Sequence, residues 1–177
     1  RGLGDVYKRQ VMQDCRVSKA NLLGEEEGGF YSIMKTFTRG RIGVAAMALG
    51  VARAAYEEAL KYSKERIQFG QPIGKFQVIR HMLADMAMEL EISRLLMYKA
   101  AWMEDQGLEC VKEASMAKLY ATEMVNRFTT NAIQIFGGYG YMMEYPVQRF
   151  YRDARVMAIG EGTSQIQRDI IAKRIGL

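Results

Sequence analysis

The stretch IGVAAMALGVARAAYEEA, residues 42–59, decides the fold class of this 177-residue chain. Its apolar positions recur at steps of three and four, which is the spacing of one buried stripe on an α-helix. The positions on the stripe are Ile42, Ala45, Leu49, Ala52, Tyr56 and Ala59. Both prolines of the chain, Pro72 and Pro146, lie outside this pattern. We therefore predict one long helix between about residues 28 and 66.

The first long helix ends at RIQFGQPIG, residues 66–74, where Gly70 and Pro72 break the periodicity. Because proline is tolerated in the first turn of a helix, Pro72 is expected to stand at the start of the next one. The apolar stripe then resumes and predicts a second long helix up to about Gln106.

Three further helices are predicted downstream. A third long helix follows Gly107 and ends at FGGYG, residues 136–140, and a short helix follows Pro146. The last helix begins near Thr163 or Ser164, either of which can cap its first amides. The sequence thus predicts an all-α fold, an antiparallel helical bundle of three long and two shorter helices.

Composition limits the class of protein. An apolar content of 49% in 177 residues suits one domain with a substantial core. The two cysteines, Cys15 and Cys110, show no paired spacing, which favours reduced thiols in a cytosol-like compartment. No apolar run approaches the roughly 20 residues of a membrane span, and no signal peptide is visible, so we expect neither.

Charge and histidine content argue against several functions. The net charge of +5 comes from basic residues that alternate with acidic ones, which argues against nucleic acid as a partner. This balance would suit an anionic small molecule such as a phosphate-bearing cofactor, but by itself it favours an ordinary solvated surface. The single histidine, His81, argues against a histidine-dependent triad and against a zinc site. Val78, three residues earlier, excludes the Glu-x-x-His pair of di-iron bundles, so no metal is predicted.

The beginning of the chain differs from the rest. Residues 1–10, RGLGDVYKRQ, have neither helical nor strand periodicity, and we expect them not to be native sequence. The stretch VMQDCRVSKANLLGEEEGGF, residues 11–30, is interpreted as a strand that runs into the first helix.

One carboxylate stands in an unusual place. AIGEGTSQIQR, residues 158–168, puts Glu161 between Gly160 and Gly162, just before the last helix. Glycine frees the backbone, so a ligand can come close to the main chain here. Two interpretations remain open from the residues alone: an acid that favours the helix dipole, or a catalytic base.

Four motifs in order resemble the C-terminal helical domain of the acyl-CoA dehydrogenases. They are ERIQFGQPIGKFQ (65–77), AIQIFGGYGY (132–141), YRDARV (151–156) and GEGTSQIQR (160–168). The resemblance extends from about Arg16 to Leu177. It implies that residues 11–27 are the remnant of a middle β-domain and its linker, and that residues 28–177 are the C-terminal helical bundle domain. The chain would then be a fragment without the N-terminal helical domain and nearly all of the β-domain.

The resemblance implies a reaction. This family oxidises an acyl-CoA thioester to the 2,3-enoyl-CoA: a carboxylate removes the α-proton, and the β-hydrogen leaves as hydride to FAD. Electron-transferring flavoprotein usually reoxidises the flavin. Glu161 matches the base, Gly162 would let the main chain approach the thioester, and Arg41 matches an arginine near the acyl-CoA cleft. Some members carry the base on the first long helix instead, where this chain has Gly40, so Glu161 is the remaining candidate.

The cofactor contacts follow from the same resemblance. Positions that match FAD contacts in the family are Arg66, Phe69, Gln77, Gln134, Gly137, Gly138, Thr163 and Gln165. A guanidinium such as that of Arg66 suits a pyrophosphate oxygen, and a helix start such as Thr163 suits phosphate. Family members make several of these contacts to a neighbouring subunit's FAD, which implies a homo-oligomer, commonly a homotetramer.

Three further expectations complete the interpretation. The protein would act in fatty acid metabolism, in a bacterial cytoplasm or the mitochondrial matrix. The fragment alone is expected to be inactive, because the family's β-domain holds most of the flavin ring. The alternatives are an acyl-CoA oxidase that uses O2, and a non-catalytic helical interaction module.

Overall fold

The computed structural model describes residues 11–177, so the expectation for residues 1–10 lies outside the described residues. The chain divides into one unit up to Met34 and a second from Lys35 to Leu177. In the first unit, the described residues form a 3-10 turn, η2 (Lys19–Asn21), and the beginning of α1 (Gly29–Glu65). The strand predicted within residues 11–30 is wrong. A single strand without a neighbour leaves its backbone groups unpaired, and no strand forms in this described stretch.

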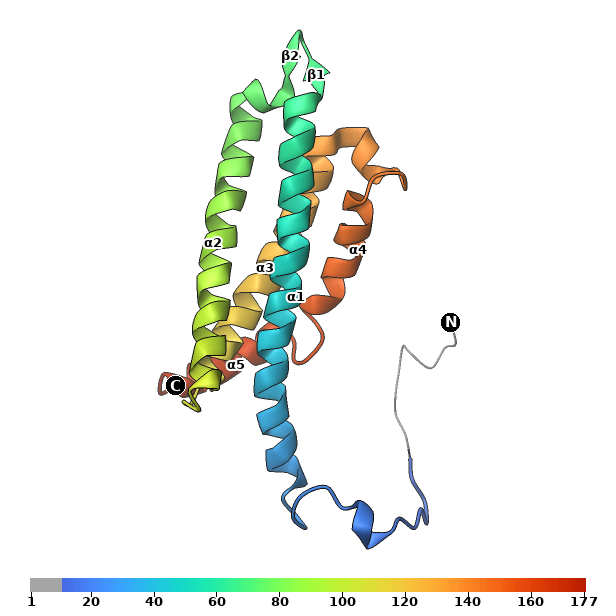
Figure 1. Ribbon diagram of the computed structural model, residues 1–177, viewed down its shortest axis with the longest axis vertical. Helices are drawn as coiled ribbons and strands as arrows, with labels where there is room; N and C mark the ends of the chain where they lie inside the picture. The colour runs from blue at the N-terminus through green and yellow to red at the C-terminus, as the bar shows by residue number, and fades with distance from the viewer. Residues whose placement is uncertain (1–10) are drawn as a thin grey trace. The chain divides into compact units, whose positions relative to one another are not determined.

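The second unit is a helical bundle (Figure 1). After α1 come α2 (Gln77–Asp105), α3 (Val111–Phe136), α4 (Val147–Met157) and α5 (Ser164–Arg174). The predicted all-α fold with three long and two shorter helices is therefore confirmed for the described residues. No helix in this part of the chain is both long and apolar enough to cross a membrane.

Ion pairs show that successive long helices are antiparallel. Arg39, early in this unit, pairs with Glu104 at the end of α2 at 2.5 Å. Arg127 of α3 pairs with Glu89 in the middle of α2. Each pair joins residues about equally far from the turn between their helices, which requires an antiparallel arrangement. Figure 1 shows α1 and α2 side by side, joined at one end by a hairpin.

The connection between α1 and α2 contains the only strands in residues 11–177. β1 (Ile67–Gln68) and β2 (Gln71–Pro72) pair antiparallel, and the two turn residues between them have φ of 52° and 77°. Positive φ at both central residues is what a tight two-residue hairpin requires. The expectation that Pro72 opens α2 is wrong, because the 3-10 turn η3 (Ile73–Lys75) separates the two.

The core of the bundle is built from small residues on α1 and from both small and large residues on α3. The alanines of the predicted stripe are fully buried, which confirms the periodicity, and Ile42, Leu49 and Tyr56 are half-buried against the core. On α3, Met124, Val125 and Phe128 are buried. Because α3 also packs against α2, α4 and α5, it is the central helix of the unit. Because the alanines of α1 are buried, they form the face that this helix turns toward the core.

Candidate active site

Glu161 lies in the turn between α4 and α5 in an uncommon backbone conformation. Its φ is 53°, and Gly162 follows with φ of 98°. A non-glycine residue at positive φ persists only where surrounding contacts hold it, and such residues gather at functional sites. Immediately afterwards, the Thr163 hydroxyl accepts a hydrogen bond from the Ile166 N–H at 3.4 Å and caps α5. The turn thus presents a carboxylate directly before a helix N-terminus.

The Glu161 carboxylate lies against α1 at Gly40. A Cβ atom built on Gly40 would lie 2.7 Å from the Glu161 Cδ, so only glycine leaves room for the acid. The next residue, Arg41, is 7% exposed. Burial lowers the pKa of its guanidinium, and the nearby negative charge of Glu161 opposes that shift. The structure therefore brings together the predicted base and the predicted substrate-binding arginine.

Two buried side chains hold this turn from the core. Lys118 of α3 is fully buried, and its Nζ donates to the Gly162 carbonyl oxygen at 2.7 Å. Gln167 of α5 is also fully buried, and its Nε2 donates to the carbonyl oxygens of Glu161 and Gly162 at 3.2 Å each. The sequence analysis missed both residues. A signal existed for Lys118, because it is a charged residue on the apolar stripe of α3.

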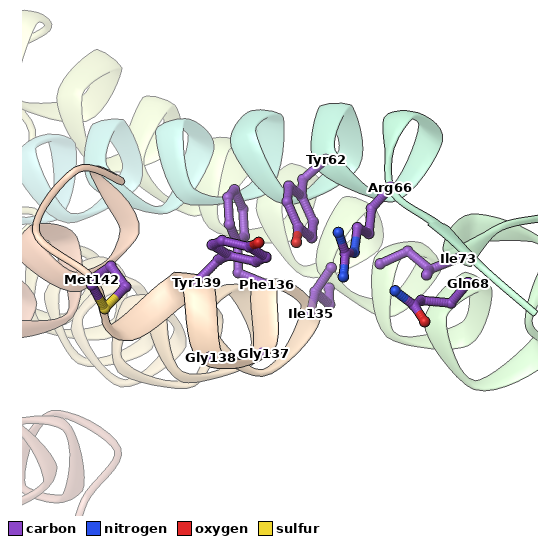
Figure 2. Close-up of a pocket in the computed structure, with 10 residues that line it drawn as sticks. All are labelled: Tyr62, Arg66, Gln68, Ile73, Ile135, Phe136, Gly137, Gly138, Tyr139 and Met142. Carbon is purple, nitrogen blue, oxygen red and sulfur yellow. The ribbon is translucent and has the colours of Figure 1, made fainter.

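A separate pocket of about 560 Å³ lies near the hairpin, between the ends of α1 and α3 (Figure 2). Its aromatic wall consists of the Tyr62 ring stacked on Phe136, with centroids 4.0 Å apart, and of Tyr139. The Arg66 guanidinium lies 5.3 Å from the centroid of the Tyr139 ring. Burial raises the pKa of Tyr62, and the charge of Arg66 opposes that shift. One cation beside flat apolar surface suits a ligand with both an anionic group and an apolar part.

The predicted cofactor residues are divided among several places. Arg66, Gly137 and Gly138 line the pocket of Figure 2 together. Gln134 lines a second hollow of about 590 Å³, and Thr163 and Gln165 line a third of about 420 Å³.

The two remaining cofactor candidates lie on exposed surface. Phe69 is 93% exposed at the hairpin tip, and Gln77 is exposed at the first position of α2. No group of three or more histidine, cysteine, aspartate or glutamate side chains within residues 11–177 is placed to hold a metal ion.

Comparison with known proteins identifies relatives. The family model described as "Acyl-CoA dehydrogenase, C-terminal domain" matches residues 27–176. The probable acyl-CoA dehydrogenase YngJ of Bacillus subtilis is 52% identical over 165 residues, which are 93% of this chain and 43% of that protein. The subunit CarC of the caffeyl-CoA reductase-Etf complex of Acetobacterium woodii is 52% identical over 162 residues, 92% of this chain and 43% of that subunit.

A solved structure agrees with these sequence matches. Butyryl-CoA dehydrogenase from Megasphaera elsdenii superposes with a TM-score of 0.91 at 49% identity. The match covers 93% of this chain and 43% of that one. The chain therefore spans less than half the length of these relatives.

Proposed function

This chain belongs to the acyl-CoA dehydrogenase family, and on that premise we propose that the complete protein oxidises an acyl-CoA thioester to the 2,3-enoyl-CoA with FAD. The observation that carries the proposal is the Glu161 carboxylate, which lies in a positive-φ turn against Gly40 and beside Arg41. Activity is assigned to the complete protein, because this chain spans only 43% of the relatives' length.

In the proposed reaction, Glu161 accepts the α-proton on its carboxylate. An α-C–H bond is a weak acid unless the negative charge that develops on the thioester oxygen is stabilised. The resemblance assigns part of that stabilisation to the main-chain N–H of the base, which here belongs to a residue at positive φ. The buried Arg41 supplies a positive charge nearby. FAD supplies the acceptor for the β-hydrogen as hydride.

The pocket of Figure 2 is the proposed site for part of the cofactor. No atom lies within 4 Å of a Cβ built on Gly137 or Gly138, so the backbone there is open to a ligand. The Arg66 guanidinium is the group that would bind a pyrophosphate oxygen. The other residues carried over from the resemblance would contact the same or a neighbouring subunit's FAD from their separate positions.

An exposed apolar stripe on α2 supports assembly into a larger protein. Its members are 40–60% exposed and recur at helical spacing: Met88, Ile92, Leu95, Tyr98 and Trp102. Contiguous exposed apolar surface of this kind commonly marks an interface. We propose that it is covered in a homo-oligomer, with a tetramer as the family expectation. Electron-transferring flavoprotein is the proposed acceptor, supported by the name of the relative from Acetobacterium woodii.

The test is anaerobic bleaching of flavin absorbance in the complete, FAD-loaded protein by a panel of acyl-CoA thioesters of different chain length. Bleaching by at least one saturated acyl-CoA, with the 2,3-enoyl-CoA as product, supports the proposal. A protein that binds FAD and is bleached by none of the panel contradicts it. Rapid release of hydrogen peroxide under air would identify an oxidase instead, and failure to bind FAD would identify a non-catalytic helical module.

A further inference from the structure

The turn that carries Glu161 is held through its carbonyl oxygens by side chains from two different helices. Lys118 reaches the Gly162 oxygen from α3, and Gln167 reaches the oxygens of both turn residues from α5. Both side chains are fully buried. The peptide planes after Glu161 and Gly162 are therefore both held in direction by hydrogen bonds from buried side chains.

This restraint acts at a strained position. Glu161 has φ of 53°, a conformation that non-glycine residues leave unless other contacts hold them. Rotation of either peptide plane would break a hydrogen bond to a buried amine or amide, and an unpaired buried donor is unfavourable. The Gln167 Oε1 has no hydrogen-bond partner within the described residues, so this buried amide is satisfied only through its N–H group. The side chain is thus placed as a donor to the turn.

A buried lysine is unfavourable in a packed core, because its charged amine loses hydration. Burial lowers the pKa of the Lys118 amine, and the positive charge of Arg41 lowers it further, whereas the negative charge of Glu161 raises it. A methionine of similar length would fill the same space without a charge to desolvate. The hydrogen-bond acceptor of the amine is the Gly162 oxygen, which belongs to the turn.

We propose that Lys118 and Gln167 are positioning residues that clamp the carbonyl groups of residues 161 and 162 and thereby hold the Glu161 carboxylate over Gly40. The kinetic consequence of the clamp rests on the proposed function, whereas its effect on backbone geometry does not. Neither residue touches the reacting atoms. Their contribution is to keep the base within reach of the α-proton, where small displacements lower the rate steeply.

The kinetic test uses Lys118→Met in the complete, FAD-loaded protein. We expect the rate of flavin reduction by saturating acyl-CoA to fall about 100-fold, with KM and FAD content unchanged. Ser115→Ala is the matched control, because Ser115 is fully buried on the same helix and its Oγ has no partner in the part of the chain that the structure describes. This control should keep the wild-type rate. An unchanged rate in Lys118→Met overturns the clamp.

A double-mutant cycle separates positioning from general packing. If Lys118 acts through Glu161, Lys118→Met should cause little further loss in a Glu161→Gln background, because the group to be positioned is already gone. An equal loss in both backgrounds overturns the proposal. Gln167→Met provides the second variant for both experiments if Lys118→Met does not fold.

A crystal structure of the variant tests the clamp without reference to activity. In Lys118→Met, or in Gln167→Met, we expect residue 161 to leave positive φ and its carboxylate to move away from Gly40. A turn that keeps its φ and its carboxylate position overturns the clamp. If none of the acyl-CoA thioesters reduces the flavin of the wild-type protein, the proposed function fails. The clamp is then decided by this structural result alone.

Discussion

The Glu161 carboxylate occupies the space that a side chain at Gly40 would need. A Cβ atom at position 40 would lie 2.7 Å from the Glu161 Cδ and 2.8 Å from its Oε1. The two positions, 121 residues apart in the chain, therefore cannot both carry an undisturbed side chain. This relationship gives a physical reason for the glycine on α1 and ties it to the acid in the turn.

Gly40→Ala should lower the rate of flavin reduction without unfolding the protein. The added methyl group meets the flexible end of Glu161, so the carboxylate moves and the backbone stays. A displacement of this kind lowers the rate by about 100-fold. Gly43→Ala is the control, because nothing lies within 4 Å of a Cβ at that position of the same helix. Equal rates in the two variants, measured by stopped-flow absorbance, would refute the close approach.

Arg66→Ala should weaken FAD binding by the complete protein. The substitution removes the cation of the pocket in Figure 2 and its contact with Tyr139. Loss of a charge-assisted hydrogen bond corresponds to a dissociation constant about 10–100 times higher. The control is Arg53→Ala, since Arg53 is an exposed residue of α1 that pairs with Glu57. Titration of each flavin-free variant with FAD measures its dissociation constant. Equal FAD affinities in Arg66→Ala and Arg53→Ala would exclude Arg66 from the cofactor site.

Ala52→Leu should destabilise the bundle, whereas Ala46→Leu should not. Ala52 is fully buried on α1, and Ala46 is exposed on the same helix. Overpacking a tight core typically costs about 1–3 kcal/mol. Thermal unfolding monitored by circular dichroism should show a lower midpoint for Ala52→Leu only. A wild-type midpoint in that variant would mean that α1 does not pack closely through its alanines.

The Arg39–Glu104 pair predicts a specific pH dependence. The hydrogen bond from Arg39 holds the pKa of Glu104 below its ordinary value of 4.5, and the hydrogen bond from the Cys110 thiol acts in the same direction. A carboxylate with a lowered folded-state pKa stabilises fully above the ordinary value, and this stabilisation is lost as pH falls through the folded-state pKa. Compared with Glu104→Gln, the wild type should therefore unfold at a higher temperature at neutral pH.

The difference in unfolding temperature between the wild type and Glu104→Gln should become smaller at acid pH. Thermal midpoints of both proteins, measured from about pH 7 downwards, test this. A difference that is the same at neutral and acid pH would show that the carboxylate charge contributes nothing. High salt should also reduce the difference, because both side chains are accessible to solvent and ions screen their attraction.

The fold could be predicted because its decisive signal is local. The buried alanines of α1 recur every three or four residues, and the sequence shows that spacing directly. The hairpin at Phe69 and Gly70 was missed as a strand pair, because two-residue strands are too short to show alternation and the turn lacks the usual Asn-Gly or Asp-Gly signal. The expected strand within residues 11–30 failed for a related reason: strand formation depends on a partner, which sequence patterning does not reveal.

The site was only partly predictable. Glu161 and Arg41 were identified through the family resemblance, and the structure brings them together. The close approach of the acid to Gly40 was not predicted, because position 40 was noted only for its lack of a carboxylate. Lys118 and Gln167 were missed because their role depends on contacts between helices far apart in sequence. A lysine on the apolar stripe of α3 was the available signal. Sequence also could not show that Arg66 and Gly137 line one pocket, since this requires the ends of α1 and α3 to lie together.

The most direct test of the central claim is the single-turnover rate of flavin reduction in Glu161→Gln. The complete protein and this variant are loaded with FAD and mixed anaerobically with the acyl-CoA that best bleaches the wild type. Glutamine keeps the size of the side chain and removes its basicity, so we expect equal FAD content and a rate at least about 1,000-fold lower. Flavin reduction by Glu161→Gln at close to the wild-type rate would contradict the assignment of Glu161 as the base.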